Sequence, residues 1–357
     1  MFVEQLYKMR YIIDITPKQS QTIQKYLEKG NYGSISQFIS TAIENQLALE
    51  ENDIIDLMPY KPAQEAQRTK NPTTAIASGN FEKYSLKNIP GFNAVIDAPE
   101  YKNLVYASQS IPENQAWIWG QINKIFPVKV GVRILHQLLA TKQSIELNEF
   151  LEIVAKEAAF LGDMIRDYET KNSRMRGEKI SPALPSTDEK SLNRYKFQFM
   201  VYLRRDGLMD GAMSLMKFCN VYEEKKKQMI SITESGLNFS SINNPVLDEN
   251  NFDLSLNDEE RFFYINHIKE NVKGEYAAIR WMLEKIKTGN NTRELLNAEI
   301  EKSFAKSWGN STTPAVINTQ RAGITARMFE LGLIEKEKVG IYVTYSASEI
   351  GQKLFLK

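Results

Sequence analysis

The first fifty residues combine a strand-like run with two amphipathic helical stretches, which is too little chain to bury a hydrophobic core alone. The strand-like run covers residues 9–15, and Thr16–Pro17 follows as a helix-start signal, because proline tolerates the first helical position. The glycines of residues 30–33 end that helix, and the capping-box pattern of residues 34–37 starts the next. The sequence therefore predicts that two copies of this segment pair through their strands.

This strand–helix–helix order resembles the ribbon-helix-helix family of DNA-binding proteins, over roughly residues 8–50. The resemblance implies that paired strands enter the major groove, with Arg10, Ile12 and Asp14 facing DNA. It places Ser34 and Ser36 where the second helix offers backbone amides to a phosphate. An apolar and an acidic residue on the reading face depart from the family pattern. We therefore expect this segment to dimerise, with base reading secondary; an ordinary helical hairpin is the alternative.

The composition sets the broad class of the chain. Its 357 residues predict two or three domains, and 42% hydrophobic with 25% charged residues is usual for a soluble protein. The net charge of +1 gives no overall basic signal for nucleic acid, so any DNA contact must come from local patches.

Cysteine usage and hydropathy indicate the compartment. Cys219 is the only cysteine, so an internal disulfide is excluded and a reducing cytoplasm is favoured. No apolar run approaches the length of a membrane span, and residues 1–4 lack the pattern of a signal peptide. We therefore expect a cytoplasmic protein without a membrane partner.

Residues 56–115 differ from the rest of the chain, because prolines punctuate them and helical periodicity is poor. The pattern predicts an irregular linker with short strands around residues 94–96 and 104–106. The predicted division of the chain is 1–55, 56–115, 116–242 and 243–357.

An internal repeat organises the remaining two thirds of the chain. In each copy a helix ends at Gly-Leu, a hairpin with a charged turn follows, and a Thr/Ser-Glu-x-Gly sequence starts another helix. In the first copy this pattern predicts strands over residues 212–218 and 228–232 around the charged residues 223–227. In the second, a charged turn at 335–338 leads into a strand at 340–345.

Both copies resemble winged helix-turn-helix domains, over roughly residues 120–242 and 256–357. The resemblance implies that a recognition helix of each domain enters the major groove with its N-terminal residues at base edges. The interruption at residues 171–190 departs from the compact family pattern. The predicted fold class is mainly α with small β-hairpins, an α+β protein with tandem winged helices.

The first recognition helix is predicted over residues 191–205. Residues 166–205 hold ten basic against five acidic residues, which favours a phosphate-rich partner, although a solvated charge run is the alternative. Arg suits guanine, Asn and Gln suit adenine, and Lys suits phosphate. The candidate DNA-binding residues are Asn193, Arg194, Lys196 and Gln198 on the helix, and Lys225, Lys226 and Lys227 on the wing tip.

The second recognition helix is predicted to begin after Thr313–Pro314 and to reach Leu331. Its expected exposed residues are Asn318, Gln320, Arg321 and Arg327. Acidic residues offset the lysines of this copy, which leaves a protein partner as the alternative to DNA.

Signatures of catalysis are missing from the sequence. There is no glycine-rich phosphate loop and no cysteine pair for zinc, and His136 and His267 stand alone in helical patterns. Asp188-x-Lys190 matches one end of a nuclease motif only by chance, because no strand surrounds it. We therefore predict no catalysis, no metal and no cofactor.

The sequence predicts a homodimer that binds double-stranded DNA, most simply a transcriptional regulator. One alternative is a DNA-binding component of plasmid replication, plasmid partition or phage defence. Two others are a protein-interaction adaptor that binds no DNA and a nuclease with an unfamiliar site.

Overall fold

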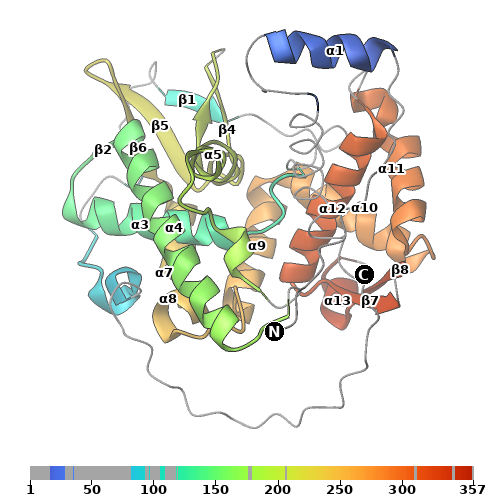
Figure 1. The fold of residues 1–357 in the computed structure, drawn as a ribbon. Coiled ribbons are helices and arrows are strands. Elements are labelled where there is room, and N and C mark those ends of the chain that lie inside the picture. Colours follow the sequence, from blue (N-terminus) through green and yellow to red (C-terminus); the bar gives the residue numbers. More distant parts are fainter. Residues whose placement is uncertain are drawn as a thin grey trace, which may run out of the picture. The chain divides into compact units, whose positions relative to one another are not determined.

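The structure is a computed structural model of the chain (Figure 1). Its contacts divide the chain into two units, residues 1–55 and 56–357. The described residues are 17–28, 35, 82–92, 96, 105–108, 118, 120–175, 179–205, 207–308, 312–339 and 342–355.

In the first unit, helix α1 spans Pro17–Glu28, so the helix predicted after Thr16–Pro17 is confirmed. Ile23 is buried, as expected for the apolar stripe of that helix. The five candidate DNA-binding residues of this unit, Arg10, Ile12, Asp14, Ser34 and Ser36, lie outside the described residues.

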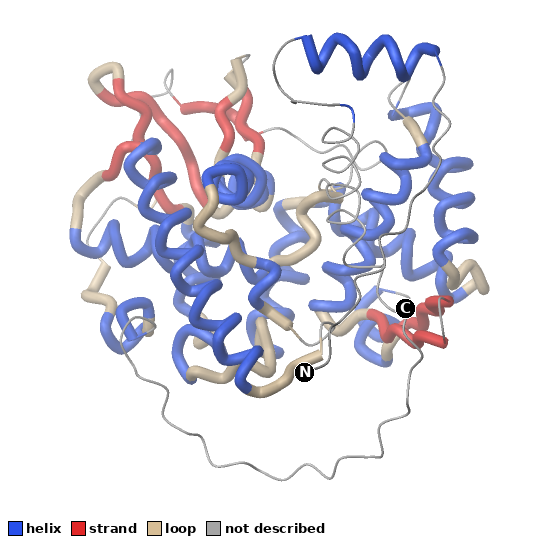
Figure 2. The backbone as a smooth tube through the Cα atoms, in the orientation of Figure 1, coloured by secondary structure: helices blue, strands red, loops and turns tan. Residues whose placement is uncertain are grey.

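The second unit is mainly helical with small sheets, which is the predicted α+β class (Figure 2). Its first half contains η1 (Glu82–Tyr84), η2 (Leu86–Asn88), β1 (Val105–Ser108), α3 (Phe126–Thr141), β2 (Ile145–Glu146), α4 (Leu147–Lys171), η4 (Ser181–Ala183), α5 (Glu189–Arg194), the π-helix η5 (Tyr195–Met200), β3 (Tyr202–Leu203), β4 (Leu208–Asp210), α6 (Ala212–Leu215), β5 (Cys219–Glu224), β6 (Lys227–Ile232), α7 (Glu234–Ser241) and α8 (Pro245–Glu249). Its second half contains α9 (Asp258–Asn271), α10 (Lys273–Lys287), α11 (Arg293–Trp308), α12 (Pro314–Glu330), β7 (Ile334–Val339), β8 (Tyr342–Ala347) and α13 (Glu349–Phe355). Among the helices that the structure describes, none has the length and hydropathy needed to cross a bilayer.

A six-stranded sheet in the first half has the order β2-β6-β5-β1-β4-β3. β5 and β6 form an antiparallel hairpin whose last pair is Glu224 with Lys227. β1 lies antiparallel to β5 and parallel to β4, and β3 pairs antiparallel with β4. Because β5 runs toward its turn while β1 and β4 run away from it, the β3–β4 turn lies at the same end of the sheet as the β5–β6 turn.

The two halves repeat one order of elements. The first half places α3, β2, α4, α5, the hairpin β5–β6 and α7 in sequence, with β3, β4 and α6 inserted before the hairpin. The second half places α10, a bridge at Thr292, α11, α12, the hairpin β7–β8 and α13 in sequence. In both halves the short strand pairs with the second hairpin strand, Ile145 with Ile230 and Thr292 with Thr344.

The first copy differs locally from its sequence prediction. Residues 212–218 are not a strand, because α6 occupies most of that stretch and the hairpin strand begins at Cys219. Gly207 does not end a helix; it has φ +80° in the turn between β3 and β4. The residues between Gly211 and Lys217 are all buried, and a short apolar run that is buried throughout does not distinguish a strand from a helical turn.

The predicted linker also contributes to the fold of the second unit. Tyr84 is buried in the core, and β1 lies inside the six-stranded sheet. β1 overlaps the strand predicted around residues 104–106 and continues to Ser108. The strand predicted around residues 94–96 is not observed at Ile96, which is an exposed bend. In a short irregular segment, buried side chains do not recur at a regular spacing, so the sequence pattern did not predict the burial of Tyr84.

Two buried cations on α3 hold the C-terminal end of α7. Lys129 Nζ donates to the carbonyl oxygen of Phe239 at 2.6 Å, and Arg133 Nε donates to that of Ser240 at 2.7 Å. Glu260 pairs with Lys129 at 2.8 Å and Asp248 with Arg133 at 2.9 Å, so both charges are compensated. The carbonyls that a helix end leaves without partners are thereby satisfied inside the core.

Gly323 on α12 lies directly against the backbone of Gly120. A Cβ on Gly323 would lie 2.2 Å from the Gly120 carbonyl oxygen, and a Cβ on Gly120 would lie 2.1 Å from that of Thr319. Only glycine allows the helix and the segment before α3 to approach this closely. The contact ties the second repeat to the start of the first.

We expect Gly323→Ala to lower the free energy of unfolding by about 1–3 kcal/mol, because the added methyl group overpacks a backbone contact. The sign of this stability change is informative, because alanine is a better helix former than glycine and would stabilise the helix if no atoms lay close to its methyl group. Urea unfolding measures the change, with Gly91→Ala as the control, because nothing lies within 4 Å of a Cβ there. An unchanged or higher stability of Gly323→Ala would contradict the close contact.

Candidate nucleic-acid interface

The β5–β6 turn presents two adjacent lysines in a strained conformation. Lys225 and Lys226 form a two-residue turn, with φ of 50° and 65°. Two positive φ values in a two-residue hairpin turn are typical of type I′, which favours Asn-Gly. A lysine in this region costs roughly 1 kcal/mol relative to glycine. The turn therefore carries two positive charges at a cost in backbone conformational energy.

A second basic turn stands beside the first, between β3 and β4. Figure 1 shows the two hairpins side by side with their turns pointing the same way, as the strand register requires. Arg205 is exposed in this turn, and Arg204 Nη1 lies 3.8 Å from Asp210 Oδ2. Cations from two separate stretches of sequence thus lie at the same end of the sheet, on hairpins that β1 separates.

Three of these cations have no carboxylate partner within the part of the chain that the structure describes. Arg205, Lys225 and Lys226 are exposed and form no ion pair with another described residue. Lys227 differs, because its Nζ lies 3.0 Å from Glu146 Oε2. The predicted lysine trio on the turn therefore reduces to two available lysines, and Arg205 from the neighbouring turn replaces the third.

The predicted recognition helix of the first copy is shorter than expected and changes character. It begins at Glu189 rather than Ser191, becomes a π-helix after Arg194, and ends at Met200 instead of residue 205. The Asp188 side chain accepts a hydrogen bond from the Ser191 amide. Asp188 is therefore the N-cap of this helix, which explains the Asp188-x-Lys190 pattern by local structure.

The candidate residues on this helix have different environments. Arg194 is exposed and forms no ion pair with the residues described, whereas Asn193 is half-buried. Lys196 pairs with Glu152 at 2.7 Å, and this hydrogen bond lowers the pKa of the Glu152 carboxyl. Gln198 is half-buried, and its Oε1 atom has no hydrogen-bond partner. Of the four, only Arg194 offers an exposed and uncompensated charge.

The second recognition helix is α12, which begins after the cap Thr313 as predicted and ends at Glu330. The prediction that Arg321 and Arg327 are exposed is wrong, because their exposures are 4% and 0%. Arg321 Nε donates to Asn297 Oδ1 at 3.0 Å, and Asn297 donates to Asn318 at 2.6 Å. Gln320 is half-buried with an Oε1 that has no partner.

A buried ionic cluster explains why this helix differs from its prediction. Arg327 donates to both oxygens of Glu275, at 2.7 and 3.0 Å, and also to the carbonyl oxygen of Ile122. Glu330 accepts hydrogen bonds from the amides of Ile125 and Phe126, at 2.5 and 3.4 Å. The segment before α3 therefore covers the polar side of α12, and helical periodicity alone does not reveal such a cover.

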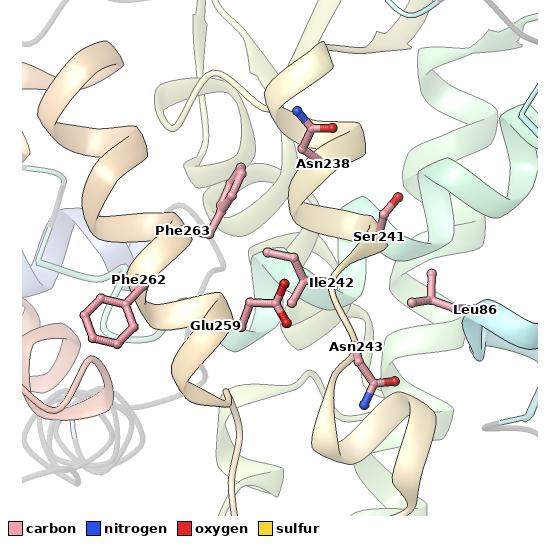
Figure 3. A pocket seen from close by; sticks show the side chains of 8 residues that line it. All are labelled: Leu86, Asn238, Ser241, Ile242, Asn243, Glu259, Phe262 and Phe263. Carbon is pink, nitrogen blue, oxygen red and sulfur yellow. The ribbon is translucent and has the colours of Figure 1, made fainter.

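Two cavities accompany these elements. One lies between α7 and α9, where Glu259 and Phe263 face Asn238 and Ser241 while Phe262 points away from α7 (Figure 3). The other lies beside the β3–β4 hairpin. Its lining residues are Gln121, Ile122, Phe197, Gln198, Tyr202, Asp210 and Gly211.

The histidines and the cysteine lie in the core. His136 Nδ1 lies 2.8 Å from Ser240 Oγ, and His267 Nε2 lies 2.6 Å from the carbonyl oxygen of Met216. Burial is the main cause that lowers the pKa of both histidines, and burial raises the pKa of the Cys219 thiol. Within the described residues, no cluster of three or more His, Cys, Asp or Glu side chains could hold a metal ion.

Comparison with protein-family models, with curated proteins and with solved structures finds no match to this chain. The inference of function therefore depends on the chemistry of the site itself.

Sequence reasoning missed the basic turn between β3 and β4. Residues 204–205 were assigned to the end of a helix, yet Asp206–Gly207 follows them between two apolar stretches. Asp-Gly between apolar runs is a strong hairpin signal. That signal was present in the sequence and would have placed Arg204 and Arg205 on a turn.

Proposed function

We propose that this protein binds DNA as a dimer, most simply as a cytoplasmic transcriptional regulator, and holds duplex DNA with the two basic turns of its first repeat. The observation that carries the proposal is the grouping of Arg205, Lys225 and Lys226 at one end of the sheet. Exposed cations without carboxylate partners suit phosphate oxygens, which supply most of the affinity in DNA binding.

The repeated order of elements supports a tandem winged-helix interpretation. A helix, a short strand, two helices and a hairpin whose second strand pairs with the short strand occur in both halves. In this interpretation β5–β6 and β7–β8 are the wings, and α5 and α12 are the recognition helices. Arg194 on α5 is then the side chain best placed to reach a base, because it is exposed and forms no ion pair with another described residue.

The two repeats have different proposed roles. In the second repeat, Arg321 and Arg327 bond inside the protein, and a segment that leads into the first repeat covers α12. We therefore assign DNA contact to the first repeat and a supporting role to the second. A protein partner at the second repeat belongs to the same proposal.

The first unit is the proposed dimerisation element. Its strand–helix–helix pattern resembles ribbon-helix-helix proteins, which pair through their strands, and the observed α1 occupies the position of the first helix. A dimer would double the number of phosphate contacts and favour a palindromic or repeated DNA site.

The double variant K225N/K226G tests the proposal, because it removes both positive charges of the turn while favouring the same turn conformation. Asn-Gly is the preferred type I′ sequence, so we expect the variant to be about 1 kcal/mol more stable than the wild type. Its affinity for a 30-base-pair duplex should fall about tenfold or more, and the slope of log K against log[salt] should become shallower by about 2. Fluorescence anisotropy between about 50 and 200 mM salt measures both changes.

The matched control is K269Q/K273Q, which removes the same charge from exposed positions on α9 and α10. It should leave both affinity and salt slope close to the wild type. Equal losses in the two variants would indicate a general charge effect and would contradict a contact at the turn. No duplex binding by the wild type at any salt would favour the adaptor alternative.

The choice of biological role needs a genomic-fragment selection with the full chain. A discrete sequence retained at physiological salt supports a regulator. Retention without sequence preference, lost as salt rises, supports a component of replication, partition or defence.

A further inference from the structure

The cavity between α7 and α9 has a volume of about 690 Å³, which is within the usual range of small-molecule sites. η2 and the segment that follows α7 complete its lining (Figure 3). None of its eight lining residues belongs to the basic turns or to the recognition helices, so the proposed function leaves this cavity without a role.

Part of the lining is apolar. Leu86, Ile242 and Phe263 line the cavity, and each of these side chains is half-buried. The Phe263 ring is held in place by stacking on the buried Phe239 ring, with centroids 5.5 Å apart at an interplanar angle of 13°. These side chains therefore offer a preformed apolar surface to the hydrocarbon part of a ligand.

The charged group of the cavity is the Glu259 carboxylate. Glu259 extends from α9 toward Ile242, and its side chain is exposed, so a dissolved ligand can reach it (Figure 3). Within the described part of the chain it forms no ion pair or hydrogen bond, and none of the lining residues is basic. A carboxylate in this position is available to a positively charged group of a ligand.

The chain around the cavity is acidic. Residues 234–260, which supply five of the eight lining residues, contain seven acidic residues and no basic one. Four of the seven carboxylates pair with cations, whereas Glu234, Glu249 and Glu259 form no ion pair with another described residue. Glu249 accepts a hydrogen bond from Asn243, a lining residue, so a second carboxylate lies beside the cavity. This charge favours a cationic ligand over an anionic one.

Two buried cations near the cavity do not cancel this negative charge. Lys129 and Arg133 donate to the carbonyl oxygen of Ile242, at 2.8 and 2.9 Å. Lys129 is paired with Glu260 and Arg133 with Asp248, so each positive charge is already matched inside the core.

We infer that this cavity binds a small organic cation, a primary ammonium group on an apolar body. An ammonium group donates three hydrogen bonds, and exposed acceptors are available on Glu259, Asn238 and Ser241. The apolar body contacts the half-buried side chains of the lining. A divalent metal ion fits less well, because the described residues contain no cluster of three or more His, Cys, Asp or Glu side chains that could hold one.

Two small molecules of nearly the same shape test the inference with the full chain in the absence of DNA. Phenethylammonium carries the positive charge, and 2-phenylethanol is its neutral analogue. We expect phenethylammonium to bind about tenfold more tightly, because only the ammonium group forms charge-assisted hydrogen bonds with a carboxylate. Ligand-observed NMR titrations measure both dissociation constants.

Glu259→Gln should lower the affinity for phenethylammonium about tenfold and leave that for 2-phenylethanol unchanged. A variant that only disturbed the fold would weaken both. Ser241→Trp should weaken both molecules, because Ser241 is an exposed lining residue where an indole ring would fill the cavity. Glu270→Gln is the matched control, since it removes the same charge from an exposed position on α9 that does not line the cavity. It should bind both molecules as the wild type does.

Several results would overturn the inference. Equal affinities of the wild type for the two molecules would remove the evidence for a cation site, and so would an ammonium preference that persists in Glu259→Gln. Unchanged binding in Ser241→Trp would place the ligand elsewhere. No binding of either molecule at about 10 mM would exclude the site. The proposed DNA contact stands or falls separately, because none of its residues lines this cavity.

Discussion

Arg327→Met is expected to lower the free energy of unfolding by about 3–5 kcal/mol. The substitution removes the only charge that the buried Glu275 carboxylate contacts at hydrogen-bond distance among the described residues, at 2.7 and 3.0 Å. Both side chains are 0% exposed, so water cannot replace the lost guanidinium. The carbonyl oxygens of Ile118 and Ile122 lose their donor as well.

Guanidinium unfolding of the full chain measures this loss, and a double-mutant cycle with Glu275→Gln isolates the pair. The double variant R327M/E275Q should recover part of the stability, because no buried charge is left unpaired. The matched control is Arg280→Met on α10, the helix that carries Glu275, since Arg280 and Glu284 form an exposed pair at 3.1 Å within that helix. That control should change stability by less than about 1 kcal/mol. A loss of similar size in both variants would contradict the cluster's role.

The same cluster has a consequence for how the unit unfolds. Arg327, Glu275 and Glu330 bond to residues 118–126, so the second repeat holds the segment from which the first begins. With the cluster intact, residues 56–357 form one contact unit. In Arg327→Met we expect the denaturation curve to broaden, because the two repeats then share fewer contacts and unfold less cooperatively.

The sequence predicted those elements whose signals are local. The caps Thr233, Thr313 and Ser348 accept hydrogen bonds from backbone amides as expected, and Gly332 adopts a positive φ of 69° after α12. A cap depends on one side chain and an amide three residues on, so the sequence contains the whole interaction. The buried stripe of α12 follows for the same reason, because Ile317, Ile324 and Met328 share one helical face.

Predictions that depended on distant contacts were less successful. The exposure of Arg321 and Arg327 was wrong, because covering segments and buried carboxylates approach from far along the chain. The insertion of β3, β4 and α6 escaped notice, because Gly207 satisfied a helix-end pattern that a hairpin turn satisfies equally well. Charge alone located the lysines of the β5–β6 turn, but the sequence did not reveal that Glu146 compensates Lys227.

Acid should destabilise the protein between pH 6.5 and 4 through His136. Burial, together with the nearby charges of Arg133 and Lys129, lowers the pKa of His136 from 6.5 to about 4. Above pH 6.5 the imidazole is neutral in both the folded and the unfolded chain, so its ionisation does not change the free energy of unfolding. As the pH falls below 6.5 the unfolded chain binds a proton that the folded chain excludes, and stability is lost by about 1.4 kcal/mol per pH unit.

The total loss from His136 is about 3 kcal/mol by pH 4, and the lowered pKa of His267 acts in the same direction. Urea unfolding at pH 7, 6 and 5 measures it, with His136→Asn as the comparison. Asparagine keeps a polar group within reach of Ser240 Oγ, the 2.8 Å partner of His136 Nδ1, but does not titrate. The variant should lose less stability than the wild type at each step down in pH. Parallel pH profiles, or an imidazole NMR titration near pH 6.5 in the folded protein, would show that His136 is not the group that acid acts on.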